Sequence, residues 1–321
     1  MSKYKVCFMG TPKLAQTVLE ALVTSGEYDV VLCCCQPDKP VGRKKIITPP
    51  PTKVYTTSLD IECFHPDSMR TDEAYEKIKA CEPDLIITAA YGKILPQRIL
   101  DIPRLGPVNV HASLLPKYRG AAPVQFAIMD GEEKTGVTIM EMDAGMDTGA
   151  IIDMEEVAID KDITTEGLMD ILAEVGGRLL LKTLPRYING ELKAVPQDEA
   201  ASTTCTMIRS EMGLIDWSKS AREVHDKIRA LTEWPGAFTY LDGGKLKIYA
   251  SGVFKGELPA EAENAEIGSI VKAHKKDLVV KCGEGYVAIK ELQVPGGKRL
   301  AAVDCAHNFK TGTLLGVSGE Q

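Results

Sequence analysis

An amide and an imidazole stand two residues apart at Asn109 and His111, where an apolar run turns polar. If residues 106–112 form a strand, side chains two apart point to the same face, so these two groups would lie side by side. The amide can donate a hydrogen bond to a carbonyl oxygen, and the imidazole can donate or accept a proton near neutral pH. Such a pair could stabilise the oxyanion of an acyl transfer.

A carboxylate that could join this pair is Asp147, in the glycine-flanked loop MDAGMDTG. Open α/β sheets bind ligands at the carboxyl ends of their strands, so this loop could reach the same crevice as Asn109 and His111. There the carboxylate would orient the histidine and handle protons. Two simpler interpretations stay open: a structural His111, and an Asp147 that only caps the turn beside Gly145 and Gly149.

Other common kinds of site are not indicated by the sequence. No Gly-x-Ser-x-Gly motif marks a serine nucleophile. Gly10 is followed by Thr-Pro-Lys rather than by a dinucleotide-binding glycine motif, and no Walker loop occurs. The nine cysteines include no Cys-x-x-Cys pair, so we expect no metal site. The adjacent Cys33, Cys34 and Cys35 are predicted to be small buried side chains.

The elements that would position these groups alternate between strands and helices. Residues 3–35 predict a strand, a tight turn, a helix and a second strand. Further strands are predicted at 84–90, at 106–112 and on both sides of the loop within 136–159, with helices at 71–82 and 164–190. This alternation indicates an α/β fold with a Rossmann-like, mostly parallel sheet covered on both faces.

A second domain is expected because 321 residues exceed what one hydrophobic core usually serves. We predict a catalytic domain at 1–189, a polar linker without periodicity at 190–207, and a C-terminal domain at 208–321. The last begins with an amphipathic helix at 220–231. Short strands broken by glycines and charged turns follow, which predicts a small β-barrel of the OB type.

The composition is that of a globular enzyme, with 44% hydrophobic and 26% charged residues. The net charge of -7 gives no overall basic signature for nucleic acid, although a local basic patch could exist. Neither a signal peptide nor a run of eighteen apolar residues occurs. We therefore expect a cytoplasmic protein that does not enter a membrane.

The run from Asn109 to Pro123, NVHASLLPKYRGAAP, together with GVTIMEMDAGMDTGAII, resembles the folate-dependent formyltransferases. In that family an Asn-x-His pair and a later Asp form the catalytic triad, which the resemblance places on Asn109, His111 and Asp147. The resemblance also implies 10-formyltetrahydrofolate as the formyl donor. Its binding site would be formed by Ser113, Leu114, Leu115 and Pro116, by Tyr91, Ile94 and Leu95 of YGKILP, and by Asp143.

Most of the chain, from residue 5 to about 316, resembles the members of this family that formylate methionyl initiator tRNA. The resemblance lies in VCFMGTPKLA, QPDKPVGRKKIITPPPTKV, GLIDWSKSAREVHDKIRAL, WPGAF and LQVPGGKRLAAVDC, with departures in STTCTMIRSEMG and GELPAEAENAE. It implies direct attack of the methionyl α-amino group on the formyl carbon, with no metal and no covalent enzyme intermediate. We expect a monomer.

The basic segment at 36–53 carries Lys39, Arg43, Lys44 and Lys45 among prolines. By itself such a segment is as often a solvated, disordered loop. In the context of the resemblance it is predicted to bind the acceptor end of the tRNA through its phosphates. The C-terminal domain would also bind tRNA, with candidate contacts at Lys245, Lys247, Lys298 and Arg299.

Two alternative functions remain at this point. The chain could be a folate-dependent formyltransferase that acts on a nucleotide sugar, although such an enzyme should lack the basic segment and this C-terminal region. It could also be a catalytically silent RNA-binding relative, against which the complete set of Asn109, His111 and Asp147 argues.

Overall fold

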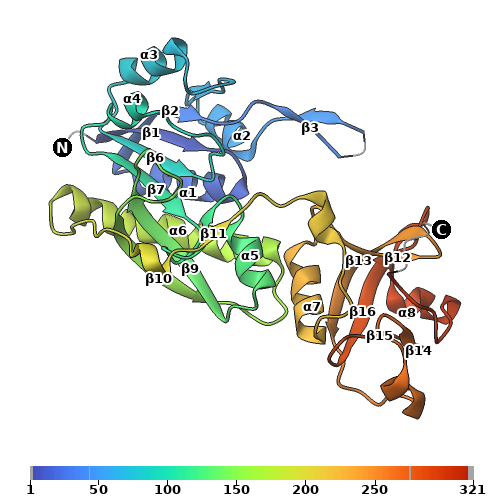
Figure 1. Cartoon of the computed structure of the whole chain (residues 1–321). Coiled ribbons are helices and arrows are strands. Elements are labelled where there is room, and N and C mark those ends of the chain that lie inside the picture. The colour runs from blue at the N-terminus through green and yellow to red at the C-terminus, as the bar shows by residue number, and fades with distance from the viewer. Residues whose placement is uncertain (1–2, 43, 275, 317–321) are drawn as a thin grey trace. The chain divides into compact units, whose positions relative to one another are not determined.

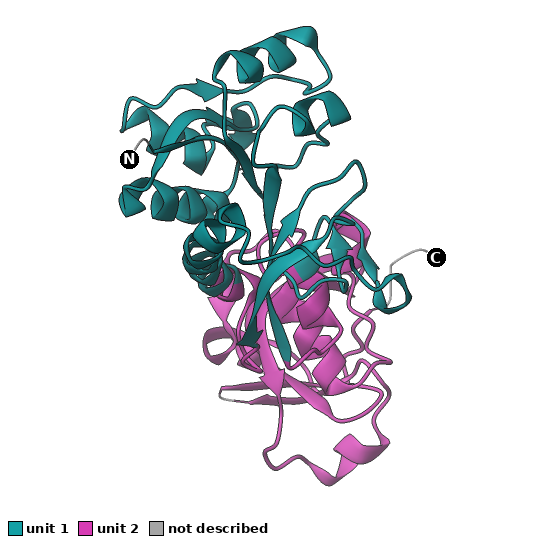
Figure 2. Ribbon diagram, turned by 90° about the vertical axis from the view of Figure 1, so that its left-hand side faces the viewer, with its two compact units in different colours: residues 1–123, 134–158, 169–206 teal, residues 124–133, 159–168, 207–321 magenta. Residues whose placement is uncertain are grey.

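The computed structural model describes residues 3–42, 44–274 and 276–316. The chain divides into two compact units, shown in different colours in Figure 2. Unit 1 comprises residues 1–123, 134–158 and 169–206, and unit 2 comprises residues 124–133, 159–168 and 207–321. The predicted domain boundaries, which divide the chain into three consecutive segments, stay a prediction.

A seven-stranded sheet forms the centre of unit 1 (Figure 1). From β7 to β5 its strands are parallel, whereas β9 runs antiparallel to both β7 and β10. This arrangement confirms the predicted α/β fold with a mostly parallel sheet. In spatial order the strands are β10 (Ile151–Ala158), β9 (Lys134–Glu141), β7 (Pro107–His111), β6 (Leu85–Ala89), β1 (Tyr4–Gly10), β2 (Tyr28–Cys34) and β5 (Cys63–Phe64).

Among the described residues, six helices accompany these strands in the sequence. Helix α1 buries Ala15, Val18, Leu19 and Leu22 on one stripe and ends at Gly26, which has the left-handed φ of 71°. The helices are α1 (Lys13–Ser25), α2 (Pro51–Thr57), α3 (Asp72–Ala80), α4 (Gln97–Leu100), α5 (Pro123–Met129) and α6 (Thr165–Ile188).

Both faces of the sheet are covered, as a parallel sheet requires. On one face α6 packs closely, because a Cβ on Gly176 would lie 3.0 Å from a methyl group of Val110, and a Cβ on Gly177 would lie 2.8 Å from that of Ala21 in α1. On the other face α3 and α4 contribute Ile78 and Ile99 to an apolar cluster with strands β1, β2 and β6.

Two short pairs of strands lie outside this sheet. β3 (Lys39–Val41) and β4 (Ile46–Thr48) form an antiparallel hairpin within the basic segment, where a loop was predicted. This hairpin projects from the rest of unit 1 (Figure 1). Its apolar side chains Val41, Ile46 and Ile47 are exposed. β8 (Arg119–Gly120) pairs in parallel with β11 (Thr204–Cys205), so the predicted linker segment is fastened to the loop that follows β7.

Unit 2 contains an antiparallel sheet, which confirms the prediction of a separate C-terminal β domain. Helix α7 (Ala221–Ala230) packs Val224 and Ile228 against the core of this sheet. A capping box between Ser220 and Glu223 fixes where α7 begins. The strands, in spatial order, are β12 (Ala237–Leu241), β13 (Gly244–Val253), β16 (Tyr286–Gln293), β15 (Asp277–Lys281) and β14 (Ile270–His274), with β17 (Arg299–Ala301) also on β16 and the short α8 (Ala302–Cys305) after it.

All nine cysteines lie in the described residues and carry free thiols. Cys33, Cys34 and Cys35 are fully buried in and after β2, as their apolar setting predicted. Among the described residues, no helix is long and apolar enough to cross a membrane.

Candidate active site

Strand β7 places Asn109 and His111 at its carboxyl end. Asn109 lies opposite Thr88 of β6 and Met140 of β9, and His111 lies opposite Thr138 of β9. The two side chains are separated by one residue of an extended strand and both reach Asp147 on the loop after β9. The structure therefore brings together the amide, the imidazole and the carboxylate that the sequence singled out.

Two hydrogen bonds fix the orientation of the Asn109 side-chain amide. Its Oδ1 accepts a hydrogen bond of 2.7 Å from the Thr88 hydroxyl, and its Nδ2 donates toward Oδ1 of Asp147 at 3.4 Å. The opposite amide orientation would set two oxygens against each other at Asp147, so the two contacts are compatible with only one assignment. One N–H of Asn109 is thus directed to Asp147, and the amide nitrogen carries a second N–H.

The imidazole of His111 is buried, with 6% of its surface exposed. Its Nε2 lies 3.0 Å from the carbonyl oxygen of Tyr118. Because a carbonyl oxygen can only accept, Nε2 carries a proton, and the neutral ring presents an unprotonated Nδ1. That Nδ1 faces Oδ1 of Asp147 at 3.7 Å, which is too long for a direct hydrogen bond.

Asp147 is held in an uncommon backbone conformation, with a φ of 55°. An Asp tolerates this left-handed region better than most residues, but the conformation still needs support from its surroundings. Part of that support comes from Gly120, whose backbone N–H donates to Oδ2 of Asp147 at 2.8 Å. With Oδ2 engaged, Oδ1 is the oxygen that faces both Asn109 and His111.

Further support for Asp147 comes from Gln197, in the segment predicted to be a linker. The Gln197 side-chain amide donates to the carbonyl oxygens of both Asp147 and Gly149, each at 2.8 Å. Its Oε1 in turn accepts a hydrogen bond of 2.9 Å from Nε of Arg119. The loop that carries the carboxylate is therefore clamped by a residue fifty positions further along the chain.

Arg119 completes this chain of contacts from β8. Its side chain is 7% exposed, and its two terminal nitrogens bind the carboxylate of Glu199 at 2.9 and 2.8 Å. Such bidentate pairing fixes the plane of the guanidinium. The hydrogen bonds and charge of Arg119 lower the pKa of Glu199, so this carboxylate stays ionised to hold the guanidinium in place.

Gly120 is needed where it stands. Its φ is 123°, and a Cβ there would collide with the carbonyl oxygen of Cys205 in β11. Only glycine combines this conformation with so close an approach. The β8–β11 pairing thus presents the Gly120 N–H to Asp147.

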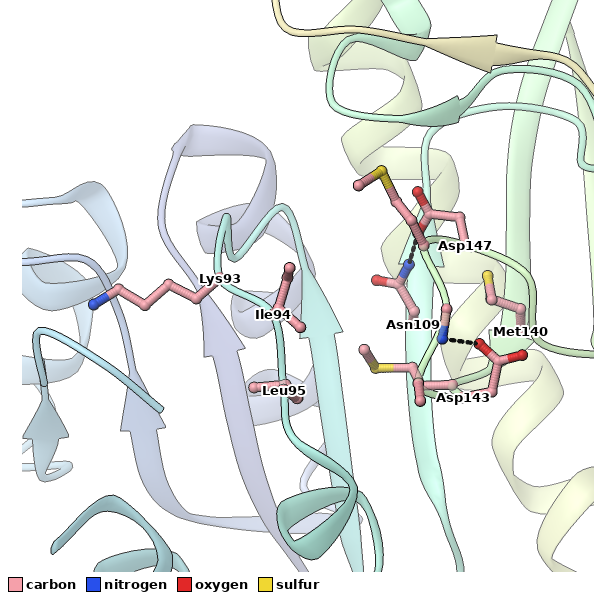
Figure 3. A pocket seen from close by; sticks show the side chains of 11 residues that line it. Lys93, Ile94, Leu95, Asn109, Met140, Asp143 and Asp147 are labelled. Carbon is pink, nitrogen blue, oxygen red and sulfur yellow. Dashed lines mark hydrogen bonds between the residues drawn. The ribbon is translucent and has the colours of Figure 1, made fainter. Parts of the chain in front are cut away.

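A cavity of about 160 Å³ lies beside these groups. Figure 3 shows Asn109 and Asp147 on one side of it, and Ile94 and Leu95 on the other. Asp143 lies in the same wall as Asp147, where its Oδ1 accepts from the Gly145 N–H at 3.0 Å and from the Thr148 hydroxyl at 2.7 Å. The residues that line the cavity are Lys93, Ile94, Leu95, Asn109, Met140, Met142 and the loop 143–147.

Of the residues expected to bind folate, Ile94, Leu95 and Asp143 line this cavity, whereas Tyr91 and the segment 113–116 do not. Tyr91 is buried and its hydroxyl donates to the sulfur of Met69 at 3.1 Å. Ser113 and Leu115 bind Thr138 of β9 through their backbones at 2.7 and 3.1 Å. Ser113 and Leu115 therefore hold the turn that follows β7 against β9.

Three of the four cations expected to bind tRNA lie in the described part of the β3–β4 segment. Lys39, Lys44 and Lys45 are exposed there, and Arg43 lies outside the described residues. The ammonium group of Lys53 binds Asp38 at 2.7 Å, close to where the hairpin begins. Within the described part of the chain, no group of three or more His, Cys, Asp or Glu side chains could hold a metal ion.

Five residues that form or support the site were missed from the sequence: Thr88, Arg119, Gly120, Gln197 and Glu199. Thr88 lies near the end of the strand predicted at 84–90 and could have been noticed as a neighbour of Asn109. Gln197 and Glu199 carry no such signal, because they lie in a polar stretch without periodicity. Their role depends on a tertiary contact with the loop after β7.

Two protein-family models match consecutive parts of the chain. Residues 3–184 match a family model described as formyl transferase, and residues 207–310 match its C-terminal domain. The chain is 44% identical to the methionyl-tRNA formyltransferase of Acetivibrio thermocellus, over 97% of this chain and 99% of that protein. It is 45% identical to the enzyme of the same name from Macrococcus caseolyticus, over 96% of each.

Solved structures of lower identity share the fold. HypX from Aquifex aeolicus, in complex with tetrahydrofolic acid, aligns with a TM-score of 0.65 at 18% identity over 94% of this chain and 47% of its own. WlaRD, a sugar 3N-formyl transferase, aligns with a TM-score of 0.63 at 19% identity over 90% of this chain and 98% of its own.

We predict that Gly120→Ala destabilises the protein more than Gly190→Ala does. Both glycines have a positive φ, but a Cβ on Gly190 meets nothing within 4 Å. The additional loss at Gly120 should be about 2 kcal/mol in the free energy of unfolding, from the collision with β11. Urea unfolding of the two variants measures the difference, and equal losses would mean that β8 and β11 are not in close contact.

Proposed function

The chain belongs to the methionyl-tRNA formyltransferase family, and we propose that it transfers a formyl group from 10-formyltetrahydrofolate to the α-amino group of methionyl initiator tRNA. It is thus a formyltransferase. The observation that carries the proposal for its donor and mechanism is the convergence of Asn109, His111 and Asp147 beside a cavity at the strand ends.

The proposed reaction begins with the neutral α-amino group of the methionyl ester. The reference pKa of an α-amino group is about 7.7 to 8.0, and esterification lowers it further, so the neutral amine is available at physiological pH. Its nitrogen attacks the formyl carbon and forms a tetrahedral oxyanion. The bond from that carbon to the folate nitrogen then breaks, the folate nitrogen takes up a proton, and the amine nitrogen loses one. No covalent enzyme intermediate is needed.

Asn109 is proposed to stabilise the oxyanion. Its Nδ2 is directed by Thr88 rather than by the substrate, so the donor is in place before the reaction begins. Such preorganised donors contribute because no reorganisation is required when the charge develops. Asn109 also lines the cavity, as an oxyanion donor must.

His111 and Asp147 are proposed to act together on protons. The unprotonated Nδ1 of His111 can accept a proton from the attacking amine, and the carboxylate of Asp147 lies 3.7 Å from this nitrogen. Once protonated, Nδ1 becomes a donor to the oxyanion, and the carboxylate of Asp147 pairs with the resulting imidazolium. The hydrogen bond from Nε2 to Tyr118 keeps the ring oriented through both states.

The folate is proposed to enter the cavity between Ile94, Leu95 and the loop 143–147. At about 160 Å³ the cavity is smaller than typical ligand pockets of roughly 300 Å³ or more, so it encloses only part of the folate. Asp143, which is bonded to Gly145 and Thr148, keeps the loop folded around that part. Tyr91 and the segment 113–116 are proposed to support the walls.

The β3–β4 hairpin is proposed to bind the tRNA. Its cations are exposed, and its backbone is already paired into a hairpin, so less conformational entropy is lost on binding than from a disordered loop. Exposed Val41, Ile46 and Ile47 add apolar surface beside Lys44 and Lys45.

The substrate is tested by formyl transfer from 10-formyltetrahydrofolate to methionyl initiator tRNA, with dTDP-linked amino sugar as the alternative acceptor. We expect turnover on the charged tRNA and none on the sugar, because the chain aligns along nearly its full length with methionyl-tRNA formyltransferases. Turnover on the sugar alone would make the chain a sugar formyltransferase. Tight tRNA binding without any transfer would make it an RNA-binding relative.

We predict that Asn109→Ala lowers kcat by about 100-fold or more, the cost of losing one oxyanion donor. Thr88→Val should lower kcat by a smaller factor, because the amide remains but is no longer oriented. Neither change should raise the Kd of folate more than a few-fold. Steady-state kinetics with charged tRNA measure this, and a kcat near that of the wild type for Asn109→Ala would remove the amide from the mechanism.

For the hairpin, we predict that Lys44→Ala with Lys45→Ala weakens tRNA binding and flattens its salt dependence. The log–log slope should fall by about 0.7 to 0.9 for each phosphate that the protein no longer neutralises. The matched control is Lys182→Ala with Lys193→Ala, two exposed lysines elsewhere in unit 1. Affinities are compared across a salt series. If the two double variants gave the same slope, the hairpin would not contact the RNA phosphates.

A further inference from the structure

Unit 2 contains a second cavity, of about 470 Å³, that plays no part in the reaction described above. Its floor is formed where two small residues, Gly252 of β13 and Ala288 of β16, lie opposite each other in the sheet. Because neither has a large side chain, the face of the sheet is hollowed there. Val253 and Phe254 extend the apolar part of the lining.

Cationic side chains surround this apolar floor. Lys161, Lys255 and Lys290 line the cavity and are exposed, and within the described residues none of their ammonium groups forms an ion pair. Arg222, from the first turn of α7, also lines it but is paired with Asp226 at 2.8 Å. Three lysines that form no ion pair among the described residues therefore line one hollow of a chain whose net charge is -7.

The wall that carries Lys161 is fixed in place by hydrogen bonds from two arginines of α7. Arg222 donates to the backbone carbonyl of Lys161 at 3.0 Å. Arg229, which is 3% exposed, donates to the carbonyls of Asp160 and Ile163 at 3.2 and 2.9 Å and is held by Asp226. The backbone around Lys161 is therefore bound to α7.

One carboxylate, that of Asp162, also lines the cavity. Its Oδ1 lies 3.2 Å from Nε2 of the buried His225, whose Nδ1 lies 2.9 Å from the Ser251 hydroxyl. Burial lowers the pKa of His225, so the ring is neutral and orients Asp162 through a single N–H. A fixed acceptor among cations suits a ligand that has both phosphate and hydroxyl groups.

We propose that this cavity binds a nucleotide of the tRNA, which gives unit 2 a defined RNA subsite; the inference rests on the proposed function. The lysines contact the phosphates, Asp162 accepts a hydrogen bond from the ribose 2′-hydroxyl, and the base or ribose covers Val253 and Phe254. Apolar or aromatic surface combined with a positive rim is how proteins hold single nucleotides of RNA. The acidic side chains of residues 257–266 do not line the cavity.

A substitution at Gly252, which lies beneath the end of the Lys290 side chain, tests the cavity without changing the net charge of the protein. A Cβ added to Gly252 would lie 3.0 Å from both Cε and Nζ of Lys290, and it meets no other atom within 4 Å. Gly252→Val therefore fills the floor and displaces the ammonium group. Because the displaced atoms are the end of a flexible side chain, the sheet should fold normally.

The experiment measures the affinity for initiator tRNA across a salt series. The variants are Lys255→Ala with Lys290→Ala, Gly252→Val, and the control Lys276→Ala with Lys310→Ala, two exposed lysines of unit 2 that do not line the cavity. We expect the first double variant to bind about tenfold more weakly, with a slope reduced by about 0.7 to 0.9 for each phosphate released. Gly252→Val should weaken binding several-fold with wild-type net charge. The control should change little.

Equal losses of affinity in the two double variants would overturn the proposal, because the effect would then be one of overall charge. So would wild-type tRNA affinity in both Lys255→Ala/Lys290→Ala and Gly252→Val. Millimolar ATP, used as a free nucleotide probe, should compete poorly. If ATP bound at the lysines while tRNA affinity was unaffected by the variants, the cavity would be a small-molecule site instead. Transfer of formyl to methionyl initiator tRNA by the wild type is measured in parallel, so that its absence would count against the proposed function and not against the cavity alone.

Discussion

The candidate site depends on holding Asp147 in a left-handed backbone conformation while its two carboxylate oxygens face different partners. Oδ2 is bound by the Gly120 N–H, which leaves Oδ1 beside Asn109 and His111. A non-glycine residue at this φ carries a strain of about 1–3 kcal/mol, so the surroundings must over-determine it. The hydrogen bonds from Gln197 to the carbonyls of Asp147 and Gly149 provide that constraint.

Because of this constraint, the segment at 190–206 is part of the site and not only a connection between domains. It supplies Gln197 to the loop, Glu199 to Arg119, and β11 to β8. Each contact is polar, directional and made with the segment between β7 and α5 or with the loop after β9. The position of the Asp147 carboxylate therefore depends on the position of the segment 190–206. The segment itself does not line the cavity beside Asn109.

Much of this could be predicted from the sequence where local periodicity controls the outcome. The period of two along β7 correctly placed Asn109 and His111 together, and alternating strands and helices correctly indicated the parallel sheet. The folding of the basic segment into a hairpin was not predicted, because its two three-residue strands are too short to show a pattern. Gln197 was missed for a different reason: hydrogen bonds between residues fifty positions apart leave no trace in local composition.

If Gln197 acts through the placement of Asp147, the effects of changing the two residues must be coupled, and a double-mutant cycle on formyl transfer to methionyl initiator tRNA measures that coupling. The cycle compares Gln197→Ala, Asp147→Asn and the combination, with single-turnover rates at saturating folate and tRNA. We predict that Gln197→Ala slows transfer by about tenfold in the wild type but by less than about twofold when Asp147 is already Asn. If Gln197→Ala slowed transfer by the same factor in both backgrounds, its contribution would be independent of Asp147, and the proposed dependence of the carboxylate on the 190–206 segment would be contradicted.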